Sequence, residues 1–99
     1  MLTHIVMWKI TDKTDMRLFE SKLEFLRDSF NNLYKSIPQI KRIEFKENVN
    51  FEDKRNSDIS LVVEFESLKD LDTYRIHPEH MKIVEVLRSL NFDRACIDV

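Results

Sequence analysis

The chain has 99 residues, of which 42% are hydrophobic and 34% are charged, and its formal net charge is −2. This length suits a single domain, residues 1–99, and the composition is that of an ordinary globular protein. Acidic and basic residues are interspersed without a long run of like charge, so neither a nucleic-acid partner nor a membrane partner is indicated.

Glycine is missing from the chain, and Cys96 is the single cysteine. A phosphate-binding loop, a dinucleotide-binding turn and a nucleophile elbow all need glycine, so these three sites are excluded. No paired-cysteine, His-Glu-x-x-His or calcium-loop pattern occurs, and we therefore expect neither a metal nor a cofactor. The N-terminal segment lacks the basic start and long apolar run of a signal peptide, which favours a cytoplasmic location.

Residues 2–10 form the first predicted strand, because they are rich in β-branched and aromatic side chains. Alternation along a strand places His4 and Trp8 on the same face. A helix is predicted next, with Thr14 as its N-cap and Pro38 at or just beyond its end. Its apolar stripe recurs at steps of three or four residues and consists of Phe19, Leu23, Leu26, Phe30, Leu33 and Ile37.

Two further strands are predicted over residues 40–51 and 59–66, with a polar turn between them. Ser67 is expected to cap a short helix, which Pro78 stops while starting another. The second helical piece carries an apolar stripe of His80, Ile83, Val84, Leu87 and Leu90. Residues 92–99 alternate as a closing strand.

The resulting order is strand, helix, strand, strand, split helix, strand. It is typical of a ferredoxin-like α+β domain, with helices on one face of a four-stranded antiparallel sheet. The uncovered face would carry either His4, Val6 and Trp8 or else Ile5 and Met7. Because a monomer rarely exposes such an apolar patch, we expect two subunits to pair their sheets and close a barrel.

Four stretches of the chain, SDISLVVEFESLKDLDTYRIHPEH, DRACIDV, HIVMWK and ENVN, resemble the stress-responsive dimeric α/β barrel (Dabb) family. The resemblance covers nearly the whole chain and implies a homodimer whose two sheets form a barrel. One plant branch of the family consists of polyketide cyclases that need no cofactor and use a Tyr–His pair beside the barrel cavity. By position that pair falls on Tyr74 and His80, with the strand histidine at His4. Ile59 stands where the cyclases place a further histidine, so a cyclase site is only partly represented.

The segment YRIHPEH admits a catalytic and a structural interpretation. Imidazole titrates near neutral pH, so His80 is a candidate general acid or base, and the Tyr74 phenol a candidate donor to a developing oxyanion. Alternatively, His80 starts a helix with its ring bonded to the backbone, and Tyr74 fills the core. His77 precedes Pro78 and is expected mainly as a helix cap, and no third ligand joins His77 and His80 in a metal site.

His4, Trp8 and His77 are the candidate ligand-binding residues. His4 and Trp8 contact a ligand if their strand face lines the cavity, and they are core residues if that face meets the helices. Cys96 is expected to be a small buried residue.

Three functions follow as hypotheses. The first is a cofactor-free cyclase, lyase or isomerase acting on a small apolar or phenolic molecule through Tyr74 and His80. The second is a carrier or sensor that binds such a molecule without chemistry, and the third is a stress-related structural dimer. A cofactor-free monooxygenase-like barrel is a further alternative. A polar-lined cavity with room for a ring would favour the first two, whereas a cavity packed shut would leave the third.

Overall fold

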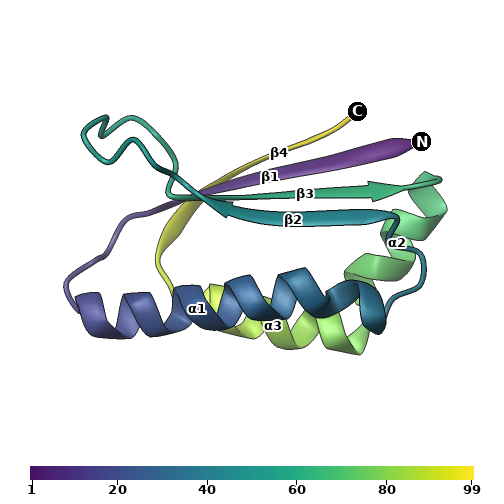
Figure 1. Cartoon of the computed structure of the whole chain (residues 1–99), viewed down its shortest axis with the longest axis horizontal. Coiled ribbons are helices and arrows are strands. Elements are labelled where there is room, and N and C mark those ends of the chain that lie inside the picture. Colours follow the sequence, from purple (N-terminus) through teal and green to yellow (C-terminus); the bar gives the residue numbers. More distant parts are fainter.

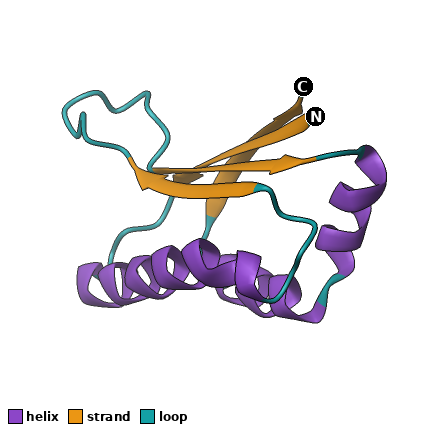
Figure 2. Ribbon diagram, turned by 45° about the vertical axis from the view of Figure 1, so that its right-hand side comes forward, coloured by secondary structure: helices purple, strands orange, loops and turns teal.

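The computed structural model describes residues 1–99 and confirms the ferredoxin-like α+β fold. Its strands form one antiparallel sheet in the order β2-β3-β1-β4. The helices all lie on one side of this sheet, and the other side is uncovered (Figures 1 and 2). The elements in chain order are β1 (Leu2–Ile10), α1 (Met16–Asn32), the short 3-10 helix η1 (Leu33–Lys35), β2 (Arg42–Glu47), β3 (Ile59–Phe65), α2 (Leu68–Ile76), α3 (Pro78–Arg88) and β4 (Phe92–Asp98).

The hydrophobic core lies between the sheet and the helices. Burial along β3 alternates strictly, with its odd-numbered residues buried against the helices and its even-numbered residues partly exposed on the uncovered face. The apolar stripe predicted for the first helix is buried along its whole length, through α1 and η1 and on to Ile37. The period-2 pattern of the strand and the period-3.6 pattern of the helix therefore predicted which residues form the two sides of the core.

The strand register decides which face of β1 meets the helices. His4, Val6 and Trp8 lie beside the buried residues of β3 and are themselves buried. Ile5 and Met7 lie on the uncovered face, which leaves that face partly apolar.

The start of α1 differs from the prediction, because Asp15 and not Thr14 is the N-cap. The Asp15 carboxylate accepts a hydrogen bond of 3.1 Å from the backbone N–H of Leu18. The Thr14 hydroxyl instead donates to the Asp12 carboxylate at 2.8 Å. Because the Thr14 hydroxyl is already bonded to Asp12, it does not cap the helix.

The second strand is shorter than predicted, and the residues after Glu47 form a loop to position 58. The Asn48 side chain turns the chain by bonding twice to the backbone of Asn50: its amide nitrogen donates to the Asn50 carbonyl at 3.1 Å, and its amide oxygen accepts from the Asn50 N–H at 3.3 Å. Such bonds offer the backbone an alternative to the sheet ladder. The loop extends beyond the sheet on the side away from the helices, and it exposes Val49 and Phe51 (Figure 1).

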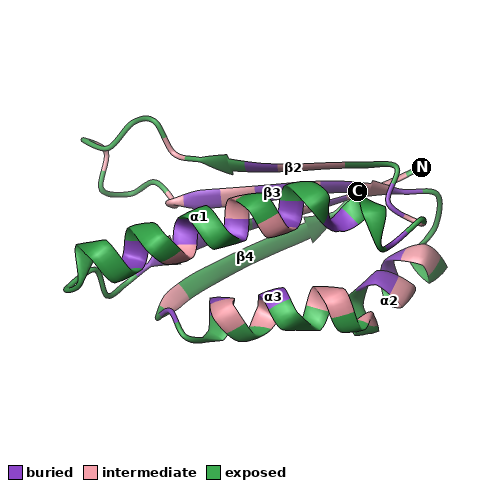
Figure 3. Cartoon of the chain, turned by 60° about the horizontal axis from the view of Figure 1, so that its bottom comes forward, coloured by how far each residue is buried: buried purple, intermediate pink, exposed green.

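Cys96 is exposed, contrary to the expectation of a buried residue. It lies on β4, an edge strand that pairs with β1 alone. Figure 3, which views the molecule from the helix side, shows β4 exposed along most of its length between α1 and α3.

None of the helices combines the length and apolar character needed to cross a bilayer.

Candidate functional site

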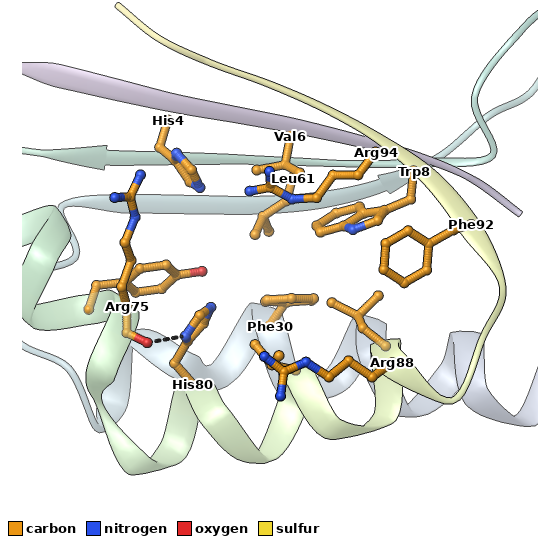
Figure 4. A pocket seen from close by; sticks show the side chains of 13 residues that line it. His4, Val6, Trp8, Phe30, Leu61, Arg75, His80, Arg88, Phe92 and Arg94 are labelled. Atoms are coloured by element: carbon orange, nitrogen blue, oxygen red, sulfur yellow. Dashed lines mark hydrogen bonds between the residues drawn. The ribbon is translucent and has the colours of Figure 1, made fainter.

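A cavity of about 270 Å³ lies between the sheet and the helical layer, within a single chain. In Figure 4 the strand residues enclose it from above and the helix residues from the left and below. Its walls combine aromatic and aliphatic side chains with histidine, tyrosine and arginine. The lining residues are His4, Val6, Trp8, Phe30, Leu61, Tyr74, Arg75, His80, Val84, Leu87, Arg88, Phe92 and Arg94.

The break between α2 and α3 brings Tyr74 and His80 together. In a continuous helix, residues six positions apart would point about 120° apart around the axis. Here His77 is extended at φ −65° and ψ 133°, the conformation favoured before a proline, and the chain restarts as a helix at Pro78. The ring centroids of Tyr74 and His80 are consequently 4.2 Å apart.

The Tyr74 side chain is buried, yet its hydroxyl has no hydrogen-bond partner. Its ring packs against Phe65 at a centroid distance of 5.1 Å, and His4 lies at 6.4 Å. Burial raises the pKa of the Tyr74 hydroxyl far above its ordinary value, and the positive charge of Arg94 offsets part of that rise. The phenol is therefore protonated at neutral pH and available as a donor.

The tautomer of His80 follows from its backbone contact. Its Nδ1 lies 3.0 Å from the carbonyl oxygen of Arg75, and a carbonyl only accepts, so Nδ1 carries the hydrogen. Burial lowers the pKa of His80 from its ordinary value of 6.5, and the hydrogen bond to the Arg75 carbonyl offsets part of that lowering. The imidazole is thus neutral at pH 7, with an unprotonated Nε2 able to act as a base.

His4 is oriented by an aspartate from the neighbouring strand. His4 and Asp98 are opposite each other in the β1–β4 pairing, and His4 Nδ1 lies 2.5 Å from an Asp98 oxygen. The other oxygen of Asp98 lies 3.5 Å from the guanidinium of Arg75. A carboxylate accepts from Nδ1–H, which leaves Nε2 of a neutral His4 as an acceptor.

Cys96 joins His4 and Asp98 in a group of three metal-ligating side chains, whose donor atoms all lie within 4.8 Å of one another. The same His4 Nδ1 that bonds Asp98 lies 3.6 Å from the Cys96 sulfur. A metal would need Nδ1 without its hydrogen, so binding an ion would require the His4–Asp98 hydrogen bond to break. The arrangement is that of a hydrogen-bonded pair with a thiol beside it.

The structure brings together four of the five residues singled out from the sequence. Tyr74, His80, His4 and Trp8 all line the cavity, whereas His77 does not. His77 instead caps α3, its Nδ1 accepting a bond of 3.1 Å from the backbone N–H of Glu79. Because the cavity lies under the helices, His4 and Trp8 are core residues and cavity residues at once.

Sequence reasoning missed the charged residues of the site. Asp98 and Arg94 alternate along the last strand on the same face, which was a usable signal. Nothing in the sequence placed that face beside His4 and Trp8, because this depends on how β4 pairs with β1.

Comparison with known proteins gives one family match. The family model described as Stress responsive A/B Barrel Domain matches residues 2–99. No curated protein matches the chain.

Several solved structures share the fold. A dimeric protein of unknown function with a ferredoxin-like fold from Bacteroides fragilis is 28% identical, with a TM-score of 0.91 over 99% of this chain and 93% of that one. A dimeric ferredoxin-like protein of unknown function from Thermobifida fusca is 18% identical, with a TM-score of 0.83 over 99% and 88%. The hydroxynitrile lyase from Passiflora edulis is 11% identical, with a TM-score of 0.74 over 99% and 90%. The last two are too distant in sequence to bear on more than the fold.

Proposed function

Since the chain belongs to the stress responsive A/B barrel domain (Dabb) family, we propose that it binds a small aromatic or phenolic molecule in the cavity and moves a proton on it without a cofactor. The observation that carries this proposal is the buried Tyr74 hydroxyl, which has no partner and lies beside His80. Buried polar groups nearly always have a hydrogen-bond partner. An oxygen of a bound ligand would supply the missing acceptor.

The cavity has the size and walls for a ring. An apolar cavity of about 150 Å³ holds benzene, and the volume here is about 270 Å³. Trp8, Phe30 and Phe92 contribute aromatic walls, and Trp8 and Phe30 stack on each other at 6.2 Å. A substituted aromatic ring fits this volume and this lining.

The proton transfer assigned to the site uses two groups. Nε2 of neutral His80 takes a proton from a carbon next to a carbonyl, and the electron pair of the broken C–H bond passes into an enolate. The Tyr74 hydroxyl donates a hydrogen bond to the enolate oxygen as negative charge develops there. Return of the proton from His80 completes an isomerisation or exchange, and no oxidant or reductant is needed.

His4 and Trp8 serve binding in this scheme. Asp98 holds the His4 ring in place, so the ring can present Nε2 to a phenolic O–H of the ligand. Trp8 forms a flat wall against which the ring lies.

Binding without chemistry is the second candidate function. The observation in its favour is that both rings also have structural roles. Tyr74 packs against Phe65 in the core, and His80 bonds the last turn of α2 through the Arg75 carbonyl. The same cavity would then serve a carrier or sensor.

We further propose that two copies of the chain pair through their sheets. The Bacteroides fragilis protein of the same fold, 28% identical to this chain, is dimeric. Ile5 and Met7 on the uncovered face lie next to Val62, Ala95 and Ile97 of the flanking strands. Covering this apolar strip would favour association.

The proton-transfer proposal predicts exchange of carbon-bound hydrogen. We expect the protein to accelerate deuterium uptake from D₂O next to the carbonyl of 4-hydroxyphenylacetone, followed by NMR. Tyr74→Phe and His80→Gln should each lower that rate by about a hundredfold, because general acid–base catalysis contributes about 10²–10⁴-fold. Tyr34→Phe, at the exposed second tyrosine, is the matched control and should not change the rate.

Fluorescence of the single tryptophan, Trp8, reports binding in the same samples. Binding with exchange no faster than in buffer would support the carrier or sensor function and reject the catalytic one. A probe that neither binds nor exchanges would reject the proposed ligand class.

A further inference from the structure

Three arginines line the cavity and no acidic residue does. They are Arg75 from α2, Arg88 from α3 and Arg94 from β4. The chain as a whole carries a net charge of −2, so this concentration of positive charge is local and does not follow from the composition. A cleft lined by charge of one sign raises the local concentration of ligands of the opposite sign.

Two of these arginines have no acidic partner. Arg75 lies 3.5 Å from Asp98, whereas Arg88 and Arg94 have no carboxylate within 4.0 Å. Arg27 and Arg55, elsewhere on the surface, do pair with carboxylates, at 2.8 and 2.9 Å. The positive charges of Arg88 and Arg94 are therefore not neutralised by any carboxylate of the same chain.

The side chains of Arg88 and Arg94 approach the cavity from opposite sides. In Figure 4 the Arg94 side chain extends from β4 past Trp8, and the Arg88 side chain extends from α3 below Phe30. Arg94 is also close enough to Tyr74 for its charge to act on the phenol. Both residues are exposed, so their guanidinium groups can meet a ligand that enters from solvent.

We propose that the ligand of this cavity carries an oxyanion, a carboxylate or a phosphate, which Arg88 and Arg94 bind while the aromatic body lies against Trp8 and Phe30. The guanidinium group is always charged at neutral pH, and its planar set of donors matches both oxyanions. Two guanidinium groups from different elements would hold the anion and fix which end of the molecule enters first. This inference rests on the proposed binding of a small aromatic molecule, and it specifies that this molecule is negatively charged.

The test compares three single-ring probes by calorimetry and Trp8 fluorescence at low salt. The probes are 4-hydroxybenzoate, phenyl phosphate and the neutral 4-hydroxybenzamide. We expect at least one anionic probe to bind about tenfold or more tightly than the amide, and the tighter of the two identifies the oxyanion. High salt should weaken binding of the anions and leave the amide unchanged.

Variants locate the anion. The double substitution Arg88→Gln and Arg94→Gln should abolish the preference for the anions, because the anionic probes lose far more affinity than the amide. Arg17→Gln, an exposed arginine on α1 that does not line the cavity, is the matched control and should keep the preference. Both positions of the double variant are exposed, so thermal unfolding should show an intact fold.

The outcomes separate this inference from the proposed function. Equal affinity for all three probes would overturn the inference and leave binding of an aromatic molecule intact. A preference that survives in the double variant would also overturn it, since the anion would then bind elsewhere. If no probe binds, the proposed function fails as well.

Discussion

Tyr74 combines a stabilising ring with a destabilising hydroxyl. Its ring packs against Phe65 and His80 in the core, and burial of an aromatic ring contributes strongly to folding. Its hydroxyl is buried without a partner, which costs about 1–3 kcal/mol of desolvation free energy. A residue of this kind has the properties of a functional group retained at the expense of stability.

Removal of the hydroxyl should therefore stabilise the protein. We expect Tyr74→Phe to raise the free energy of unfolding by about 1 kcal/mol, because the ring remains and the unpaired group is lost. Urea unfolding at one fixed protein concentration measures this difference. Tyr34→Phe, at the exposed tyrosine, should change the free energy of unfolding little. If Tyr74→Phe instead destabilises the protein by 1 kcal/mol or more, as expected for loss of a made hydrogen bond, the hydroxyl is structural.

At the scale of the element, the break between α2 and α3 is built by His77 and Pro78. The His77 ring caps α3 by accepting from the backbone of Glu79, and proline occupies the first helical position, where no donor is needed. The cap stabilises the first turn of α3 from outside the cavity, and Pro78 independently favours a helix start at the same point.

Substitution of His77 separates capping from ligand contact. His77→Ala should lower the free energy of unfolding by about 1 kcal/mol, the usual cost of losing an N-cap. His77→Asn should retain most of the stability, because asparagine is a strong N-cap residue. Neither change should alter probe binding in the cavity. If asparagine loses as much stability as alanine, or if both variants lose probe binding, capping is not the main role of His77.

At the scale of the whole molecule, the helices cover one face of the sheet and leave the other, partly apolar face uncovered. Met7 is 44% exposed and Ile97 is 56% exposed on that face. Val49 and Phe51 are exposed on the loop that extends past the same side. A second copy placed on this face would cover the strip and close the barrel proposed above.

Charge placed on this face should prevent pairing. Sedimentation equilibrium should give twice the chain mass of 12.0 kDa for the parent. We expect Met7→Glu to weaken the dimer about a hundredfold or more, because an unpaired buried carboxylate costs several kcal/mol. Met16→Glu, at an exposed methionine at the start of α1, is the matched control and should remain dimeric. A parent that sediments at 12.0 kDa at every concentration would reject the proposed dimer.

Local patterns in the sequence determined most of the fold. The alternation in residues 59–66 marked β3, the spacing from Phe19 to Ile37 marked the buried stripe of the first helix, and Pro78 marked the split second helix. These features depend on side-chain periodicity and on the backbone restrictions of proline, and both act over a few residues. The N-cap of α1 was harder to predict, because neighbouring side chains compete for the same hydrogen bonds. Thr14 bonds to Asp12, and Asp15 caps the helix.

Only the tertiary structure decided what surrounds Tyr74 and His80. Alternation assigned His4 and Trp8 to one face of a strand, but the packing of α1 and α3 determined that this face is buried. Asp98 and Arg94 reach the site because β4 pairs with β1 in one register, across more than eighty residues of chain. A shift of one residue would turn both side chains to the opposite face. Strand pairing of this kind depends on the packing of the whole core, whereas helix breaks and strand alternation depend on residues that are close together in the sequence.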